Sequence, residues 1–296
     1  MEYCRFFSTL FNIKQETLLL LILQTYNDYS ELAPYGYSIV LTGFAFYLFR
    51  LFENFYGNYF NKPLLRHYLI YKKLSETQVE VLKEEFSFYN SLSKKHQLQF
   101  QHRVASFISD KEYVGREDFI ITERIKILIA ATGCMLSFGR KNYGYNLIEY
   151  ILVYPKEFYS NINEAYHMGE FNPKGKALVL SWKDFEEGYD ISNDNRNLGI
   201  HEFMHAMQLE AKHGSDGDSD RFEKQFQNIL KQLSKPEIKD KLIDTRYFRD
   251  YAFTNQYEFM AVMAEYFFES PKEFKKLFPE LYEYSKKLLN FNFVNY

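Results

Sequence analysis

Two histidines four residues apart constrain this chain more than any other feature of its sequence. His201 and His205 enclose Glu202 in the pattern His-Glu-x-x-His. Positions i and i+4 of an α-helix project from one face, so both imidazoles can bind one zinc ion while Glu202 addresses a water molecule beside it. Asn195 or Asn197 can cap the start of that helix. The competing interpretation is a pair of ordinary surface or core histidines on a helix.

A catalytic zinc ion needs a third protein ligand and an open coordination position. Gln208 and Ala211 occupy the positions at which some zinc enzymes continue the motif with glycine and histidine, so the third ligand comes from elsewhere. A carboxylate-rich helix expected at residues 255–268 offers Glu258 and Glu265, seven residues apart on one face. Only one of them can bind the metal. The small residues close to Glu258 favour it, whereas Glu265 can equally orient a histidine.

The first sixty residues differ from the rest, because they are dense in Phe and Tyr and because no charged residue lies between Glu31 and Arg50. This stretch approaches the roughly 20 apolar residues that a membrane-crossing helix needs. We expect residues 1–60 to carry a transmembrane or interfacial helix at about 32–52; a helix packed in a protein interior reads similarly. Lys and Arg favour the downstream side, so a spanning helix would anchor the bulk of the chain at the cytoplasmic face of the inner membrane.

Residues 61–296 read as a single mainly helical domain. Ser75 and Gln78 have the spacing of a capping box, and Thr122 can cap a helix that follows it. Short apolar runs at 150–154 and 177–182, bounded by Pro, Gly and Asn, are typical of strands. Helices followed by a small sheet and further helices indicate the α+β class.

The composition excludes some classes of protein and some kinds of partner for this chain. With 46% hydrophobic and 25% charged residues the chain is not disordered. A net charge of -3 gives no general attraction to phosphate backbones, so we expect no nucleic-acid partner. Cys4 and Cys134 are too few for a disulfide framework or for a thiolate zinc site, and their scarcity fits a reducing compartment.

Two segments carry a family resemblance. Residues 177–208 contain Leu-Ser-Trp and the Gly-x-His-Glu-Phe-x-His core, and residues 250–282 contain a Tyr-rich, Glu-rich block ending in Glu-Tyr-Phe-Phe. Over residues 75–290 the chain resembles the Mlc titration factor A family of zinc-dependent peptidases. That family is similar to gluzincins in its catalytic arrangement and to the anthrax lethal factor catalytic domain in fold.

The resemblance implies a role for individual residues. It implies that His201, His205 and Glu258 bind zinc, that Glu202 is the general base, and that Tyr251 stabilises the transition state. The implied activity is zinc-dependent hydrolysis of peptide bonds in a peptide or protein substrate. The alternative function is that of a regulatory binding protein that sequesters a transcriptional repressor, as the family name implies. Gln208 departs from the family, in which an acidic residue stands at this position.

Other features are weaker. An extended substrate can add beside the strand at 177–182, which lies just upstream of the metal-binding motif. His167 and Glu170 can line a cleft, or can equally belong to a structural turn. The segment 213–220 superficially resembles a calcium loop, but it lacks the final glutamate, so we expect a solvated loop.

Overall fold

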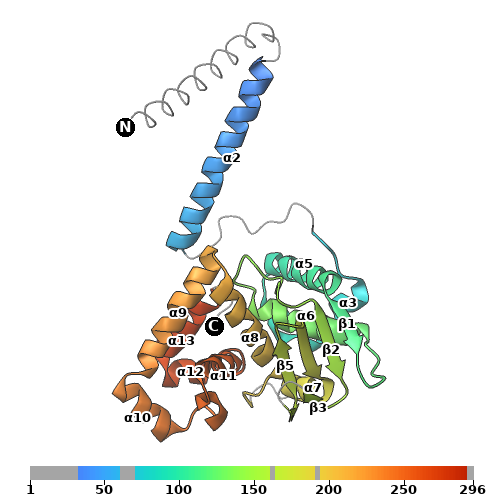
Figure 1. The fold of residues 1–296 in the computed structure, drawn as a ribbon, viewed down its shortest axis with the longest axis vertical. Coiled ribbons are helices and arrows are strands. Elements are labelled where there is room, and N and C mark those ends of the chain that lie inside the picture. Colours follow the sequence, from blue (N-terminus) through green and yellow to red (C-terminus); the bar gives the residue numbers. More distant parts are fainter. Residues whose placement is uncertain (1–32, 61–70, 161–163, 191–193, 292–296) are drawn as a thin grey trace, which may run out of the picture. The chain divides into compact units, whose positions relative to one another are not determined.

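The computed structural model describes residues 33–60, 71–160, 164–190 and 194–291 (Figure 1). The chain divides into two compact units, Met1–Phe60 and Asn61–Tyr296. The expectations for the first thirty-two residues, including Cys4, lie outside the described residues.

The described part of the N-terminal unit is a single long helix, α2 (Ala33–Phe60). Within it, Pro34–Phe52 has a mean hydropathy of 1.2 and none of this stretch is buried. Among the described residues, this is the one helix long and apolar enough to cross a membrane. The hydroxyl groups of Ser38 and Thr42 donate to backbone carbonyls one turn earlier, at Pro34 and Ser38, so these polar groups are satisfied within the helix.

The second unit is an α+β domain, as its sequence predicts. Four helices come before most of the sheet: α3 (Glu76–Glu85), α4 (Ser87–Ser91), α5 (Lys94–Asp110) and α6 (Glu123–Leu136). The strands are β1 (Glu112–Gly115), β2 (Tyr150–Tyr154), β3 (Phe158–Ser160), β4 (Ala165–His167), β5 (Gly169–Asn172) and β6 (Ala177–Ser181). The remaining helical elements are α7 (Trp182–Asp190), α8 (Leu198–His213), α9 (Gly217–Leu233), α10 (Pro236–Thr245), η1 (Asp250–Phe253), α11 (Gln256–Glu269), α12 (Pro271–Leu277) and α13 (Pro279–Leu288).

The main sheet has the strand order β1-β2-β6-β5. Strands β1, β2 and β6 are parallel, and β5 pairs antiparallel with β6. Strands β3 and β4 form a separate antiparallel pair. Because β6 lies between β2 and β5, every residue of this strand is buried and both of its edges are already hydrogen-bonded. The prediction that a substrate adds beside the strand at 177–182 is therefore wrong. Strand β5 is at the edge of this sheet.

Helices α6, α8 and α11 occupy the centre of the domain. Most residues of α6 and α11 are buried, which explains their nearly continuous apolar sequences. Helix α8 contacts both α6 and α11, and it also contacts strands β5 and β6 (Figure 1). The His-Glu-x-x-His motif therefore lies between the sheet and the C-terminal helices.

Two glycines allow the helices to approach α8 closely. A Cβ atom on Gly133 in α6 would lie 2.9 Å from the ring of Phe203 in α8. A Cβ atom on Gly199 in α8 would lie 2.5 Å from the ring of Phe185 in α7. Both rings are buried and cannot move aside freely, so any larger residue would push α8 away from its neighbours.

The capping predictions agree with the structure. Ser75 and Gln78 form a reciprocal capping box at the start of α3, and the Thr122 side chain accepts a hydrogen bond from a backbone N–H at the start of α6. Of the two asparagines predicted to cap α8, Asn197 is the cap, and its side chain accepts a hydrogen bond from the Ile200 N–H at 2.9 Å. Asn195 instead adopts the left-handed region with a φ of 58°, which asparagine tolerates better than most residues.

Candidate metal centre

Helix α8 presents the His-Glu-x-x-His residues toward the interior of the domain. His201 and Glu202 are buried, with 7% and 6% of their surfaces exposed, and His205 is partly buried. The cap at Asn197 begins the helix four residues before His201, so the first histidine lies in a well-formed turn. The motif is therefore set on a rigid and packed helix.

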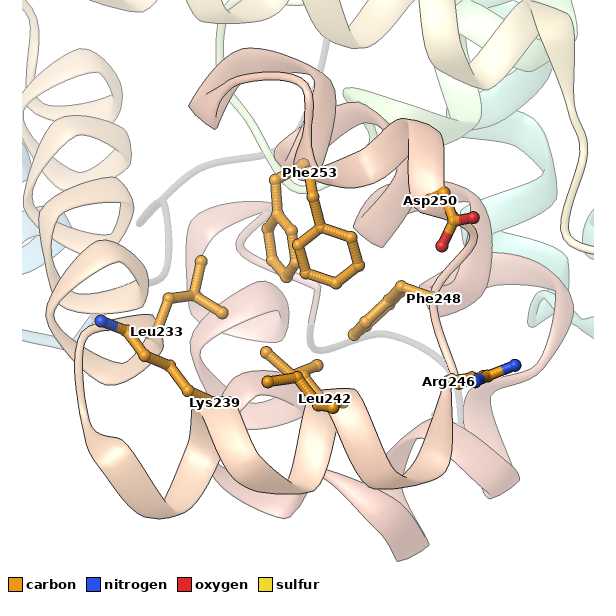
Figure 2. A pocket seen from close by; sticks show the side chains of 9 residues that line it. Leu233, Lys239, Leu242, Arg246, Phe248, Asp250 and Phe253 are labelled. Atoms are coloured by element: carbon orange, nitrogen blue, oxygen red, sulfur yellow. The ribbon is translucent and has the colours of Figure 1, made fainter.

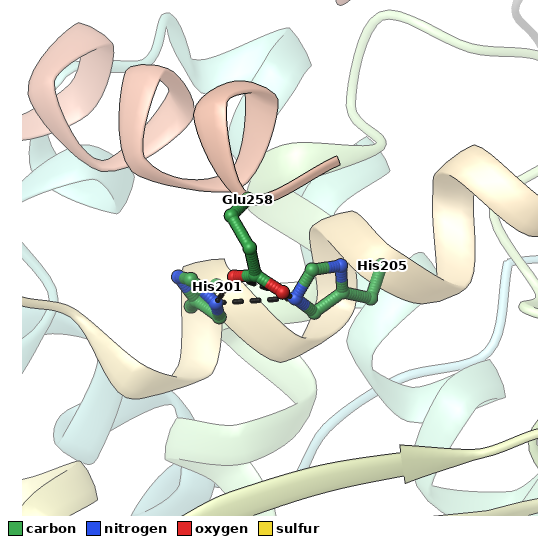
Figure 3. A group of neighbouring side chains, drawn as sticks. All are labelled: His201, His205 and Glu258. Atoms are coloured by element: carbon green, nitrogen blue, oxygen red, sulfur yellow. Dashed lines mark hydrogen bonds and ion pairs between the residues drawn. The ribbon is translucent and has the colours of Figure 1, made fainter. Parts of the chain in front are cut away.

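Helix α11 brings Glu258 to the same place (Figure 3). Asn255 caps α11 by accepting from the backbone N–H groups of Tyr257 and Glu258, at 2.8 and 3.1 Å. Glu258 Oε2 lies 2.9 Å from His201 Nε2 and 3.4 Å from His205 Nε2. The two Nε2 atoms are 3.1 Å apart. Three donor atoms from two helices thus converge within 4.8 Å of one another.

This donor set fits a zinc ion. Two imidazoles and one carboxylate from the protein, with further coordination positions left open, are typical of catalytic zinc sites. Burial lowers the pKa of His201, but hydrogen bonds to Glu258 and Glu265 outweigh burial and raise it to about 10. Burial raises the pKa of Glu258, but the imidazoles of His201 and His205 hold it well below its usual range. The carboxylates and the imidazoles therefore stabilise each other's charged forms.

Glu265 contacts the far side of the first histidine ring. His201 Nδ1–H donates to Glu265 Oε1 at 2.8 Å, which leaves Nε2 as the atom that faces Glu258. Glu265 also accepts from the backbone N–H of Asn197 at 2.8 Å. Arg249 donates to both carboxylate oxygens of Glu265, from Nη2 at 2.7 Å and from Nη1 at 2.9 Å. This carboxylate is almost fully buried and has its hydrogen bonds filled.

Arg249 was not found by sequence reasoning. It lies sixteen residues before Glu265 and has no helical spacing to it, since it precedes η1 while Glu265 is on α11. The guanidinium also donates to the backbone carbonyl of Asn195. Only the fold brings this bidentate contact together, so a sequence pattern could not have shown it.

Glu202 lies against strand β5. Burial raises the pKa of Glu202, whereas the charges of His201 and His205 act in the opposite direction. Gly169, the first residue of β5, provides the space for this carboxylate. A Cβ atom at Gly169 would lie 2.8 Å from both Cγ and Oε1 of Glu202. The glycine is a second residue of the site that sequence reasoning missed.

Tyr251 lies on η1, close to the same cluster. Its ring centroid is 5.8 Å from that of His201, and 51% of its surface is exposed. Burial and the nearby carboxylates of Glu258 and Glu202 raise the pKa of Tyr251, so the phenol keeps its proton across the physiological range. The structure thus brings all five residues named from the sequence and the resemblance into one neighbourhood.

The weaker candidates lie mostly on helices and strands instead of in turns or loops. His167 ends β4 and Glu170 lies within β5, so neither belongs to a turn. Most of the segment 213–220 is not a loop, because α8 runs to His213 and α9 begins at Gly217. Asp216 caps α9 by accepting from two backbone N–H groups, which accounts for it without a calcium ion.

Two cavities flank this region. The larger, of about 700 Å³, is lined mainly by apolar side chains, among them Leu233, Leu242, Phe248 and Phe253 (Figure 2). The second, of about 420 Å³, is polar and lies among α8, α9 and the start of α11. Phe253 belongs to η1, which also carries Tyr251, so η1 contributes one side chain to the apolar cavity and another close to His201.

Comparisons with known proteins agree with these observations. The model of the glucose-regulated metallo-peptidase M90 family matches residues 63–289. An uncharacterized protein of Synechocystis is 27% identical over 70% of this chain and 81% of its own length. The Mlc titration factor A of Pectobacterium atrosepticum is 25% identical over 61% of this chain and 74% of its own. That of Yersinia pestis is 22% identical over 72% and 86%.

The family match covers more than half of the chain and includes every residue of the His201, His205 and Glu258 cluster. The resemblance to Mlc titration factor A is confirmed by these relatives, whereas the likeness to the lethal factor fold stays a prediction. The chain belongs to the glucose-regulated metallo-peptidase M90 family.

Proposed function

We propose that residues 61–296 form a zinc-dependent peptidase domain that hydrolyses peptide bonds. The observation that carries this proposal is the convergence of His201, His205 and Glu258 within 4.8 Å, beside a buried carboxylate at Glu202. His201 and His205 would hold zinc through Nε2, and Glu258 through a carboxylate oxygen. Zinc in such a site lowers the pKa of water toward neutrality and polarises a peptide carbonyl.

The protein's own residues supply the proton transfers. Glu202 is the general base, because its carboxylate is next to the first histidine, is shielded from bulk water and has a pKa raised by burial. The same carboxyl group then returns the proton to the leaving amine. Tyr251 keeps its proton and is a hydrogen-bond donor for the oxygen that becomes negative in the transition state. Glu265 and Arg249 hold the His201 ring in its orientation.

The substrate is a peptide that lies along the outer edge of β5. This edge strand begins at Gly169, which contacts Glu202, so a peptide added there would pass the proposed base. Backbone hydrogen bonds to β5 would bind the peptide regardless of its sequence. The cavities beside the site would then select its side chains.

Glu202→Gln tests the peptidase proposal directly. The variant keeps the size of the side chain and leaves the three proposed ligands intact, so zinc content should match that of the wild type. Peptide hydrolysis should fall by at least about a thousandfold, because the general base is gone. The proposal fails if the wild-type protein cleaves a broad peptide library no faster than this variant.

The alternative function is regulatory binding. Two of the relatives described above are named Mlc titration factor A, and this name supports sequestration of a transcriptional repressor as the alternative function. A chain acting only in this way would show no hydrolysis, and its affinity for a repressor protein would be the same in the wild type and in the Glu202→Gln variant. The comparison of these two proteins therefore separates the two functions.

The N-terminal unit is proposed to anchor the peptidase domain to a membrane. Helix α2 supports this role through its uncharged stretch and its exposed apolar side chains. Because basic residues follow this helix more often than they precede it, the catalytic domain would lie on the cytoplasmic side of the inner membrane. No nucleic-acid partner is proposed.

A further inference from the structure

The polar cavity of about 420 Å³ continues the metal-binding face of α8 toward its C-terminus. His201, His205, Gln208 and Lys212 stand at positions i, i+4, i+7 and i+11 and so form one stripe on the helix. The first two form the candidate metal centre, and the last two line the cavity. Metal site and cavity are therefore neighbours on one helix face.

The cavity is within reach of a substrate side chain. Gln208 follows His205 by three residues, which corresponds to about 4.5 Å along the helix axis. An extended peptide advances about 3.3 Å per residue. One or two residues of an extended peptide therefore span a comparable distance. Tyr257, which lines the cavity, directly precedes Glu258 in the chain.

Gln208, which lines this cavity, has a side-chain acceptor that is not hydrogen-bonded to any described residue. The residue is only 5% exposed, and its Nε2 donates to the backbone carbonyl of Tyr257 at 3.2 Å. Its Oε1 is buried and has no hydrogen-bond partner within the described part of the chain. Leaving a buried acceptor unpaired costs about 1–3 kcal/mol, so a ligand that donates a hydrogen bond here is favoured.

The rim of the cavity has an excess of negative charge. Helix α9 contributes the exposed carboxylates of Asp220 and Glu223, and α8 contributes one ammonium group, from Lys212. A cationic donor would satisfy the acceptor of Gln208 and the excess negative charge together. A neutral or acidic side chain would satisfy at most one of them.

We propose that this cavity is a specificity subsite that binds a Lys or Arg side chain of the peptide substrate. The terminal nitrogen donates to Oε1 of Gln208, and Asp220 and Glu223 supply the opposite charge. The inference rests on the proposed peptidase function and names the substrate class of that site. It assigns Gln208 a role in substrate selection.

The test measures peptide binding to full-length protein carrying Glu202→Gln, so that it does not depend on hydrolysis. Fluorescence polarisation would compare labelled peptides that differ at a single position, occupied by Lys, Arg, norleucine, Gln or Glu. The position would be moved through two residues on each side of the central peptide bond. At one position, Lys and Arg peptides should bind about tenfold more tightly than the norleucine peptide.

Two additional substitutions locate the preference. Gln208→Leu removes the buried acceptor, and Glu223→Gln removes one rim charge without disturbing the interior. Each should reduce the preference for Lys over norleucine by about three- to tenfold. Glu237→Gln, an exposed carboxylate on α10 outside the cavity, is the matched control and should leave the preference unchanged.

The outcomes distinguish this inference from the proposed function. Equal binding of Lys, Gln and norleucine peptides at every position overturns the subsite, and so does a preference that both cavity substitutions leave intact. Wild-type protein that cleaves peptides without any preference for basic residues refutes the subsite alone. Selective binding of basic peptides by a wild-type protein that cleaves none of them refutes the peptidase proposal alone.

Discussion

Glu258 and Glu265 lie seven residues apart on α11 and contact opposite nitrogens of the same imidazole ring. Glu258 is 2.9 Å from His201 Nε2, and Glu265 is 2.8 Å from His201 Nδ1. Two turns of one helix therefore hold the ring of His201 from both sides. The two carboxylates have different surroundings, because of the two only Glu265 accepts hydrogen bonds from Arg249.

This difference predicts unequal effects on metal binding. Glu258→Gln should reduce the zinc content of dialysed protein to near zero, because it replaces the proposed anionic ligand. Glu265→Gln should weaken zinc binding by about 10- to 100-fold, because the histidine loses its charged partner while all three ligands remain. Competition with a chelator measures both affinities. A greater loss in Glu265→Gln than in Glu258→Gln would contradict the proposed ligand set.

Gly169→Ala should inactivate the protein without removing metal. The added Cβ atom would meet Glu202 at 2.8 Å and Leu198 at 2.7 Å, so the proposed base must move. Moving a catalytic group by about 1 Å lowers kcat/KM by about 100-fold. Gly175→Ala is the matched control, because its Cβ atom would make ordinary contacts at 3.5 Å or more. Equal kcat/KM for both variants would contradict the role of Glu202.

The buried carboxyl group of Glu269 predicts a pH dependence of stability. Both of its carboxylate oxygens are buried. Burial, together with the negative charges of Glu265 and Asp194, raises the pKa of Glu269 to about 8, while Asn197 and Asn195 act in the opposite direction. Between its ordinary value of 4.5 and about 8, the folded protein binds more protons than the unfolded chain.

The free energy of unfolding should therefore fall as the pH rises through this range, by up to about 1.4 kcal/mol per pH unit. Glu269→Gln should remove this part of the slope, and Glu84→Gln, at an exposed position on α3, should retain it. Urea denaturation at about pH 5, 6.5 and 8 measures the difference. Parallel slopes for wild type and Glu269→Gln would show that Glu269 does not titrate in this window.

Helix α2 should determine membrane association. Full-length protein is expected to sediment with anionic phospholipid vesicles, and the double substitution Val40→Lys and Phe44→Lys should abolish this, since each lysine in the apolar stretch costs about 2–3 kcal/mol. Ile120→Lys, which changes an 80% exposed residue of the second unit, is the control. Sedimentation that survives the double substitution would mean that another part of the chain binds the lipid.

Local patterns explain why much of the fold was predictable. The capping box at Ser75, the cap at Thr122 and the strands predicted at 150–154 and 177–182 depend on neighbouring residues, and all are present, except that Trp182 begins α7 instead of ending the second strand. The His201 and His205 pair also depends on spacing within one helix. Predicting that Glu258 approaches this pair required the family resemblance, because residue spacing alone left Glu265 as an alternative.

The errors and omissions concern contacts between distant segments. The strand at 177–181 has the pattern of a buried strand, but the pattern does not reveal that β5 covers its second edge. Arg249 and Gly169 have no local signal either, because their partners are sixteen and thirty-three residues away in the sequence. Such residues become visible only after the helices and the sheet have been assembled.

The glycines of the domain have a consequence for genetic analysis. Gly133 and Gly199 determine how closely the neighbouring helices approach α8, and Gly169 makes room for a carboxylate on it, yet none of them carries a reactive group. In an unbiased screen for inactive alleles, substitutions at these three positions should be recovered together with those at His201, His205 and Glu202. The alleles at Gly133 and Gly199 should also lower protein abundance in the cell, whereas those at Gly169 should leave it near normal.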